Sequence, residues 1–169
     1  FPLGTDGSAA HKDNNTAAAS KTYPAVNGYT FKYTNGNGKV YPDSIDAKGN
    51  SCIKFGSKSA AGSLQFEVPE NVTSVKLYVA KYKANTTKVS INGGAAQTLT
   101  KKSDDGQYDV ITVDTTTNKT VKVATVSGGY RMMMNTVEYY GVAASEPVET
   151  TYYTTVIESE PTTPVETTT

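Results

Sequence analysis

The sequence predicts an all-β protein, an antiparallel β-sandwich of the jelly-roll type. Three observations lead to this class: short segments in which apolar and polar residues alternate, turn residues at close intervals, and no amphipathic stretch long enough for a helix. Strands of this kind each bury one face, so two sheets must pack against each other. At 169 residues the chain has the length of one ordinary domain.

The two ends of the chain differ in composition from its middle. Residues 1–22 are polar, Ala-rich and without a sustained period, which indicates a flexible leader or an early strand that docks late. Residues 145–169 consist mostly of Thr, Glu, Pro and Val, and this composition predicts an extended linker because it buries little apolar surface. A last strand at residues 152–157 is the alternative. The sandwich is therefore expected to occupy residues 23–144.

Strand patterns follow one another through that middle part. In residues 28–34, GYTFKYT, aromatic side chains alternate with Thr, Lys and Thr, and the NGNG of residues 35–38 ends the pattern. Residues 88–100 predict a hairpin across Asn92-Gly93-Gly94, because Asn-Gly accommodates the positive φ values of a tight turn. The same alternation predicts strands at residues 51–55, 63–68, 72–83, 108–114, 120–126 and 131–140.

Charge and hydropathy exclude several partners. Sixteen basic and sixteen acidic residues cancel, which favours neither a nucleic-acid-binding protein nor a membrane-surface protein. Five of the acidic residues lie in residues 145–169, so the remaining part of the chain is mildly basic. No apolar run approaches the roughly 18 residues that span a bilayer. We expect a monomer without a nucleic-acid or membrane partner.

Cysteine and histidine offer no catalytic or metal centre. Cys52 is the single cysteine, so an internal disulfide is excluded, and we expect it to be a small buried strand residue. His11, the single histidine, lies in the polar leader and makes no convincing base for a cysteine nucleophile. No Cys/His cluster has the spacing of a zinc site, and no acidic run has that of a calcium loop. We expect no cofactor, with a structural calcium ion left open.

The carboxylates are explained by local structure. A glycosidase needs two of them at a defined separation across a cleft. Here each carboxylate has a simpler explanation, as a turn residue, a strand end or a solvent-facing side chain, so we expect a module that is not an enzyme. The candidates are Asp43 and Asp46 in a loop after Tyr41-Pro42, Asp104-Asp105-Gly106 at a hairpin tip, Asp114 at a strand end, and Glu138 facing solvent.

Residues 127–141, SGGYRMMMNTVEYYG, contain the only arginine, all three methionines and three of the twelve tyrosines. Tyrosine offers a flat amphipathic surface to a sugar ring, and arginine offers a rigid fork of donors to its hydroxyls. The alternative is that Arg131 pins a carboxylate such as Glu138 or Asp114, or holds a loop carbonyl. The candidate ligand-binding residues are Tyr130, Arg131, Tyr41, Tyr78, Tyr82, Lys81 and Lys83.

The same stretch also predicts part of the core. Alternation sends one or two of Met132, Met133 and Met134 inward, where methionine fills irregular gaps. Tyr139 and Tyr140 are adjacent in a predicted strand, so they cannot both face the core. One of the two is expected to be exposed or to pack beneath the linker.

Residues 50–141 resemble a non-catalytic β-sandwich module that is appended to many secreted multi-domain proteins of gut bacteria. The resemblance rests on the KFGSKSAAGSLQF hairpin, the VKLYVAKYK strand, the INGG turn and the closing SGGYR…VEYYG strand. The Thr/Glu/Pro tail is similar to the linkers of modular cellulosome and amylosome components. Together these likenesses imply a secreted or cell-surface carbohydrate-binding module, joined through its linker to further modules of the same chain.

Starch or a maltooligosaccharide is the first choice of ligand that the resemblance implies. The chain has no tryptophan, which many starch-binding modules use, so the site must be built on tyrosine. The implied function is adhesion of a multi-modular protein to polysaccharide. The alternative is a structural or protein-interaction module appended to a secreted hydrolase or nuclease.

Overall fold

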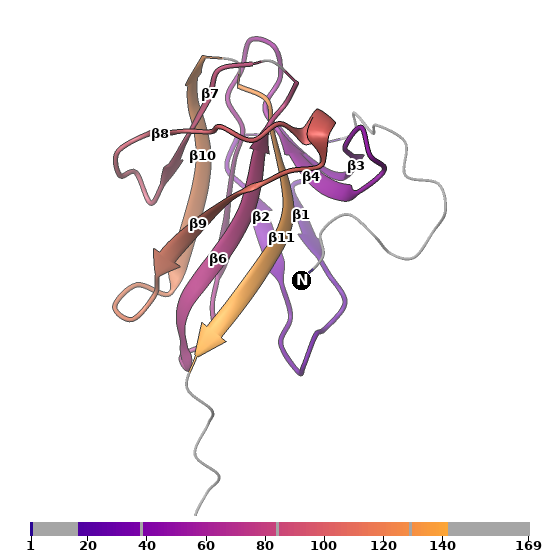
Figure 1. Cartoon of the computed structure of the whole chain (residues 1–169). Helices are drawn as coiled ribbons and strands as arrows, with labels where there is room; N and C mark the ends of the chain where they lie inside the picture. Colours follow the sequence, from indigo (N-terminus) through magenta and orange to yellow (C-terminus); the bar gives the residue numbers. More distant parts are fainter. Residues whose placement is uncertain (2–16, 38, 84, 129, 142–169) are drawn as a thin grey trace, which may run out of the picture.

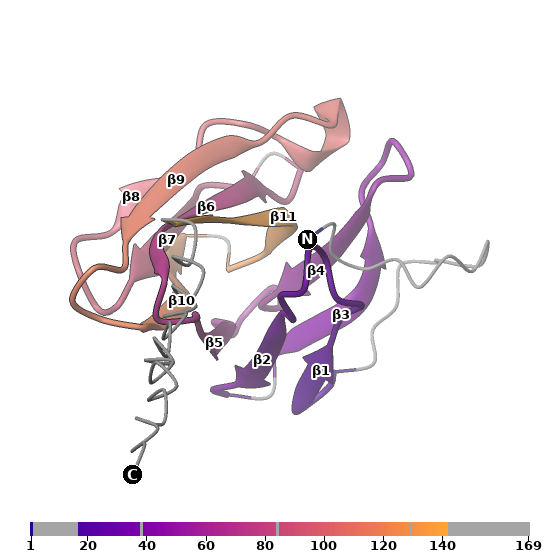
Figure 2. The ribbon, with the colours of Figure 1, turned by 90° about the horizontal axis from the view of Figure 1, so that it is seen from below.

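The structure, a computed structural model, describes residues 1, 17–37, 39–83, 85–128 and 130–141. In this part, two antiparallel sheets of six and five strands pack face to face, as Figures 1 and 2 show from two directions. One short 3-10 turn, η1 (Ser103–Asp105), is the helical content of the described residues. The predicted antiparallel β-sandwich is confirmed. Its strands are β1 (Ser20–Thr22), β2 (Lys32–Asn35), β3 (Val40–Ile45), β4 (Ser51–Phe55), β5 (Ser63–Glu67), β6 (Val72–Lys81), β7 (Thr87–Ile91), β8 (Gln97–Thr98), β9 (Asp109–Asp114), β10 (Thr120–Gly128) and β11 (Met132–Gly141).

The strand order identifies the sandwich as a jelly roll. The six-stranded sheet has the order β1-β2-β5-β10-β7-β8, and the five-stranded sheet has the order β3-β4-β11-β6-β9. From β4 to β11 successive strands alternate between the two sheets, except that β7 and β8 form a hairpin within one sheet. This winding is that of a jelly roll, as the sequence predicted.

Several strands agree with the sequence patterns in detail. Phe31 and Tyr33 are fully buried whereas Lys32 between them is exposed, so the aromatic residues face the core. The predicted hairpin joins β7 to β8, with positive φ at Asn92 (50°) and Gly93 (74°). These agreements arise because successive side chains of a strand point to opposite faces. A strand with one buried face therefore has an apolar residue at every second position.

Two loop predictions are wrong. Residues 40–45, which include Asp43, form the edge strand β3 and not a loop. Pro42 is tolerated because the pairing with β4 is irregular between Tyr41 and Ser44, and because an edge strand needs fewer ladder bonds. Pro, Asp and Ser are typical turn residues, so the sequence pattern of this strand indicated a loop.

The second correction concerns the predicted hairpin tip at Asp104-Asp105-Gly106. These residues form η1 and its C-cap, and Gly106 adopts φ 64° in the left-handed region. The turn connects β8 in one sheet to β9 in the other, so it is a crossover and not a hairpin.

The ends of the chain are described only in part. β1 begins at Ser20, so the last three residues of the predicted leader form a strand that pairs with β2. Phe1 exchanges two backbone hydrogen bonds with Val137 of β11, N–O distances 2.6 and 3.0 Å. Residues 2–16 of the leader, the predicted linker 145–169 and the alternative strand at 152–157 lie outside the described residues. Where the chain is described, no helix has the length and apolarity to cross a membrane.

The core lies between the two sheets and includes two of the three methionines. Met132 and Met134 are fully buried in it, whereas Met133 faces the other side of β11. Tyr139 packs against the core and Tyr140 is 43% exposed, which confirms that only one of this pair faces inward. The largest fully buried side chains in the described residues are Tyr33, Phe31, Phe55, Ile53, Leu64, Leu77, Met132, Met133, Met134, Val40 and Val72.

Replacement of Gly56 is expected to destabilise the fold far more than replacement of Gly49. Both residues have positive φ, 68° and 81°, which costs an L-residue about 1–2 kcal/mol. A Cβ atom at Gly56 would also lie 2.2 Å from the carbonyl oxygen of Tyr130, whereas one at Gly49 would meet nothing within 4 Å. We expect Gly56→Ala to lower the free energy of unfolding by about 4 kcal/mol or more, and Gly49→Ala by about 1–2 kcal/mol.

Urea unfolding of the two variants measures this difference. Equal losses at the two positions would show that the contact between Gly56 and the Tyr130 backbone relaxes without cost.

Candidate functional site

A second layer of buried residues lies on the outer face of the five-stranded sheet. Lys54, Met133 and Ala80 stand side by side on β4, β11 and β6. They alternate with core residues and so face away from the core, yet their exposure is only 5%, 1% and 0%. Other parts of the chain must therefore cover this end of the outer face.

Asp46 and Tyr108 are part of that cover. Asp46 directly follows β3 and Tyr108 directly precedes β9, which are the two edge strands of the sheet. The Tyr108 hydroxyl donates to Oδ2 of Asp46 at 2.5 Å and lies 3.3 Å from Sγ of Cys52. This contact joins the two edges of the sheet across its outer face, and we call it the Tyr108–Asp46 bridge.

The Asp46 carboxylate is fully engaged in this arrangement. Its Oδ1 accepts hydrogen bonds from the backbone N–H groups of Lys48 and Asn50, at 2.8 and 2.9 Å. Its Oδ2 accepts a third from the Asn50 side-chain amide at 2.8 Å, besides that of Tyr108. Burial alone would raise the pKa of Asp46, but the four hydrogen bonds outweigh burial and lower it. Asp46 is therefore a charged structural residue.

Cys52 and Tyr108, the two titratable residues beside Asp46, stay neutral. Burial raises the pKa of the Cys52 thiol to about 11, so it is protonated at neutral pH, as expected for a buried structural cysteine. Burial and the hydrogen bond to Asp46 raise the pKa of Tyr108, which keeps its hydroxyl a donor. The bridge therefore contains one charged group, the Asp46 carboxylate, and all of its hydrogen-bond donors are neutral.

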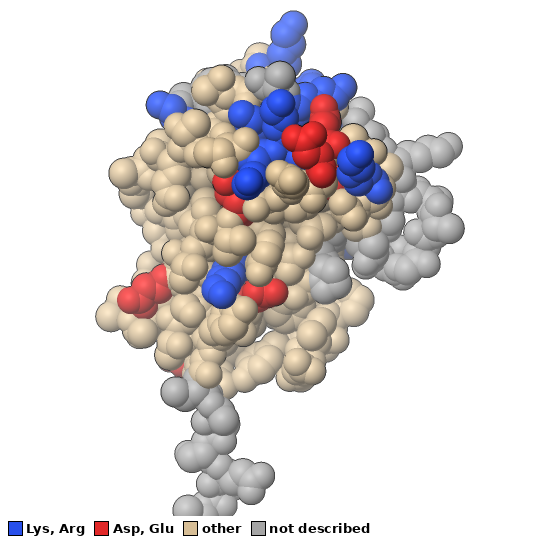
Figure 3. Space-filling view, viewed as in Figure 1, with Lys and Arg blue, Asp and Glu red and all other residues tan. Residues whose placement is uncertain are grey.

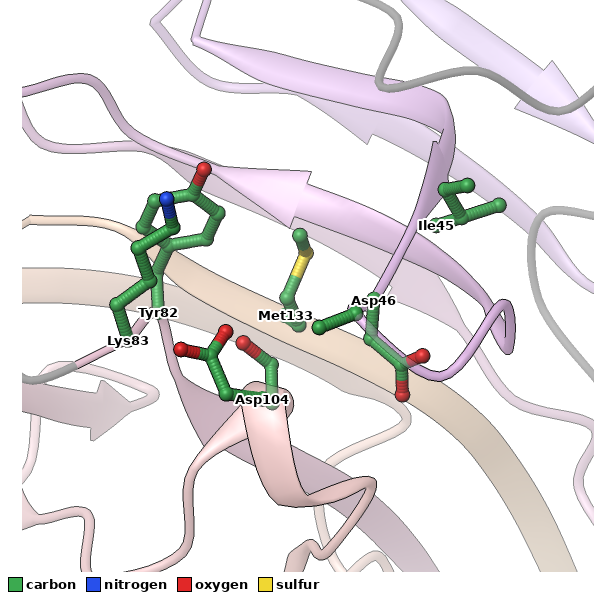
Figure 4. Close-up of a pocket in the computed structure, with 8 residues that line it drawn as sticks. Ile45, Asp46, Tyr82, Lys83, Asp104 and Met133 are labelled. Carbon is green, nitrogen blue, oxygen red and sulfur yellow. The ribbon is translucent and has the colours of Figure 1, made fainter.

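Beside the bridge lies a groove of about 220 Å³, shown in Figure 4. Met133 lies in the middle of the groove, with Tyr82, Lys83 and Asp104 of η1 on one side of it and Ile45 and Asp46 on the other. The carboxylate of Asp46 is turned away from the space above Met133. The lining residues are Ile45, Asp46, Ala47, Tyr82, Lys83, Ser103, Asp104 and Met133.

Two cations lie over the ring of Tyr82. The guanidinium carbon of Arg131 is 5.2 Å from the ring centroid, and Nζ of Lys83 is 5.4 Å from it. The backbone carbonyl of Arg131 accepts hydrogen bonds from the Tyr82 N–H at 3.1 Å and from the Thr87 hydroxyl at 2.9 Å. These contacts hold the end of β6, the start of β7 and the start of β11 together.

Lys83 has an unusual backbone conformation for a residue with a long side chain. Its φ is 54°, in a turn closed by the hydrogen bond from the Asn85 N–H to the Tyr82 carbonyl, at 3.2 Å. A non-glycine residue in this region costs about 1–2 kcal/mol, and such strain is concentrated at functional sites. The turn places the ammonium group over the Tyr82 ring at the end of the groove.

The structure brings together three of the predicted site residues: Tyr82, Lys83 and Arg131. Tyr130 precedes Arg131 in the chain, and its carbonyl group packs against Gly56.

The other predicted residues lie elsewhere. Tyr41 is on the edge strand β3, with Nζ of Lys54 5.0 Å from its ring centroid. Lys81 is adjacent to Ala80 in β6, so its side chain points to the opposite face. Tyr78 is on the outer face but pairs with Val110, two residues beyond the Tyr108–Asp46 bridge along β9.

The alternative role of Arg131 as a partner of Glu138 or Asp114 does not describe this structure. Glu138 accepts hydrogen bonds from Tyr78 and Tyr140, and Asp114 accepts them from Thr116. The guanidinium group lies over Tyr82 instead.

Sequence reasoning missed Met133 and Asp104 as groove residues. Met133 was expected to be either core or surface, and its outward direction follows only once Met132 and Met134 are known to face the core. Asp104 was assigned to a hairpin tip, because two consecutive Asp residues before Gly are typical of turns. Neither position carries a local signal for ligand binding.

The groove can make several kinds of contact with a ligand. Asp104 provides a carboxylate acceptor, Lys83 an ammonium donor, and Ile45 and Ala47 an apolar surface. Acid–base catalysis of glycoside hydrolysis needs a carboxylic acid with a raised pKa, whereas the pKa of Asp46 is lowered and its oxygens are occupied. Among the described residues, no group of three or more His, Cys, Asp or Glu side chains could hold a metal ion.

No protein-family model and no curated protein sequence matches this chain. Among solved structures, it is similar to an exo-β-1,3-galactanase from Phanerochaete chrysosporium in complex with β-1,3-galactotriose. The TM-score is 0.40 and the identity 18%, over 73% of this chain and 29% of the galactanase. It is also similar to TmCBM61 in complex with β-1,4-galactotriose, with a TM-score of 0.30 and 11% identity, over 73% of this chain and 83% of that module.

The chain thus spans less than a third of the length of the galactanase. At these TM-scores and identities, the two likenesses identify neither a family nor a ligand for this chain.

The Tyr108–Asp46 bridge is expected to make stability depend on pH. Asp46→Asn should lower the free energy of unfolding at about pH 7 by about 1.5–3 kcal/mol, because an amide cannot accept all the hydrogen bonds of a carboxylate. Folding lowers the pKa of Asp46 from its ordinary value of 3.8. The stabilisation is therefore present above that value and is lost as the pH falls through the folded-state pKa.

Urea unfolding of the wild type and Asp46→Asn between about pH 7 and pH 2 tests this dependence, and the two stability curves should converge at the acid end. Asp105→Asn, which alters an exposed carboxylate of η1, is the matched control and should follow the wild type. A constant difference between the wild type and Asp46→Asn across this range would contradict the assigned role of the bridge.

Proposed function

We propose that this protein is a non-catalytic module that binds a neutral polysaccharide in the groove above Met133. The observation that carries the proposal is that one groove brings together Tyr82 with its two cations, the carboxylate of Asp104, and the apolar side chains of Ile45 and Ala47. Sugar rings present hydroxyl groups that need directional donors and acceptors, and C–H faces that need apolar contacts. This groove offers all three kinds of contact within a small space.

Each residue has a distinct part in the proposed binding. Lys83 donates to sugar hydroxyls, Arg131 does so from the adjoining end of β11, and Asp104 accepts from them. Ile45 and Ala47, the apolar lining residues that are not buried, contact the apolar face of the ring. A cation covers part of the Tyr82 ring, so Tyr82 holds the donors in position and is not an open stacking platform.

The state of the carboxylates supports binding without catalysis. Asp46 and Asp104 both line the groove, as a pair of glycosidase carboxylates would. However, the contacts of Asp46 are those of a structural anion, with four donors and a lowered pKa. Asp104 would then have no second carboxylate in this groove with which to form a catalytic pair.

An α-glucan remains the first choice of ligand, from the resemblance of the sequence to starch-adherence modules. The same resemblance implies a secreted or cell-surface location and adhesion as the role of the module. A groove of this size makes few contacts, so we expect dissociation constants in the micromolar to millimolar range, about −8 to −4 kcal/mol. Further modules joined through the linker would raise retention on a polysaccharide by multivalency.

Native gels cast with soluble starch, β-1,4-galactan, β-1,3-galactan, glucomannan or xylan test the proposal. We expect the wild type to be retarded by at least one polysaccharide, with starch first. Lys83→Gln and Arg131→Gln should each weaken binding about tenfold or more, because a hydrogen bond from a charged donor contributes about 1.5–3 kcal/mol.

Lys122→Gln is the matched control, since Lys122 is an exposed lysine on β10 of the other sheet. It should bind like the wild type. Migration of the wild type without retardation in every gel would reject the proposal and favour a structural or protein-interaction module.

A further inference from the structure

A second cluster of polar and aromatic side chains lies on the outer face of the five-stranded sheet, away from the groove. The hydroxyl groups of Tyr78 and Tyr140 both donate to Oε2 of Glu138, at 3.1 and 2.7 Å. The ammonium group of Lys76 lies 4.7 Å from the centroid of the Tyr140 ring. We call these four residues the tyrosine–carboxylate patch.

Strand register places the whole patch on one surface. Glu138 is directly opposite Lys76 in the β6–β11 pair, and Tyr140 is directly opposite Ser74. Tyr78 is two residues from Lys76 on β6, so its side chain projects to the same face. This is also the face that carries the groove, but the Tyr108–Asp46 bridge lies between the two.

The patch lies outside the core, with Tyr140 exposed and Lys76, Tyr78 and Glu138 half-buried. Tyr140 is 43% exposed, and Val110, which is directly opposite Tyr78 on β9, is 50% exposed. Figure 3 shows that this lower part of the face carries few charges, whereas basic and acidic side chains crowd its upper end. Exposed hydrogen bonds of this kind contribute little to folding stability, so stability does not account for the arrangement.

The hydroxyl groups of the two tyrosines are held as hydrogen-bond donors. The hydrogen bond to Glu138 is the main reason that the pKa of Tyr78 and that of Tyr140 are raised, so both hydroxyls keep their protons. Oε1 of Glu138 accepts no hydrogen bond from a described residue in this structure. The patch therefore presents aromatic surface, one acceptor atom and one ammonium donor.

These groups select among ligand classes. An apolar protein surface would bury Glu138 and Lys76 away from water without new partners, which is costly. An anion such as a phosphate would be repelled by Glu138, with only Lys76 to attract it. A neutral sugar satisfies the carboxylate and the ammonium group with hydroxyls, and its C–H face contacts the tyrosine rings.

We infer that Tyr78, Glu138 and Tyr140, with Lys76, form a second carbohydrate-binding site on the same face of the sheet, and that its ligand is a neutral oligosaccharide. The inference rests on the proposed function for the class of ligand, but it assigns a separate set of residues. Two sites on one domain bind one polysaccharide chain or two neighbouring chains together, which raises retention on the polymer.

Isothermal titration with maltohexaose and with β-1,4-galactotetraose tests the number of sites. We expect the wild type to bind two molecules of one probe per chain. The double variant Tyr78→Ala/Tyr140→Ala should bind one molecule, as should Lys83→Gln/Arg131→Gln, because each removes a different site. On a gel of the corresponding polysaccharide, either double variant should bind at least about tenfold more weakly than the wild type.

Two further variants separate binding from folding. Glu138→Gln keeps the shape of the side chain and should weaken the second site, whereas Gln65→Ala, on the exposed face of β5 in the other sheet, should leave both sites unchanged. Unfolding curves of all variants confirm that they are folded before titration.

The outcomes distinguish the two proposals. Binding of one molecule by the wild type, with no change in the patch variants, would overturn the second site and leave the groove intact. Binding that is lost in the patch variants and kept in the groove variants would support the second site and reject the groove. No binding of either probe to the wild type would reject both.

Discussion

The hydrogen bond between Tyr108 and Asp46 is the contact on which the outer face of this sandwich depends. It joins the segments next to β3 and β9, the two edges of a five-stranded sheet, at a distance of 2.5 Å. Because its acceptor is a carboxylate with three further donors, it is a strong contact for a loop. It accompanies the burial of Met133 and Ala80 on that face, bounds the groove, and separates the groove from the tyrosine–carboxylate patch.

The single arginine has two roles. Its backbone carbonyl has a structural role, and its side chain has a proposed role in ligand binding. The carbonyl of Arg131 accepts hydrogen bonds from Tyr82 and Thr87 and so ties three strands together. Any residue could supply that carbonyl. The guanidinium group over Tyr82 is specific to arginine, since it combines a planar cation that stacks on a ring with several donors at its edge.

Local patterns revealed most strands but only part of the candidate site. Alternation located β9 because it has one buried face, and the residues of a tight turn located the β7–β8 hairpin. It failed at β3, where Pro42 and an irregular pairing interrupt the period. Among the predicted ligands, Lys81 and Lys83 are two positions apart, so a continuous strand would send both side chains to the same face. Strand β6 ends at Lys81, and the turn at Lys83, with φ 54°, places the Lys83 side chain at the groove instead.

The sequence by itself determined the class of fold, the faces of its strands and the burial of Cys52, because these depend on residues within a few positions of each other. Only the tertiary structure decided which side chains meet on the outer face. Tyr108 and Asp46 are 62 positions apart, and Tyr78 and Glu138 are 60 apart. Such contacts depend on strand order and register in the sheet, which the spacing of residues along the chain does not specify.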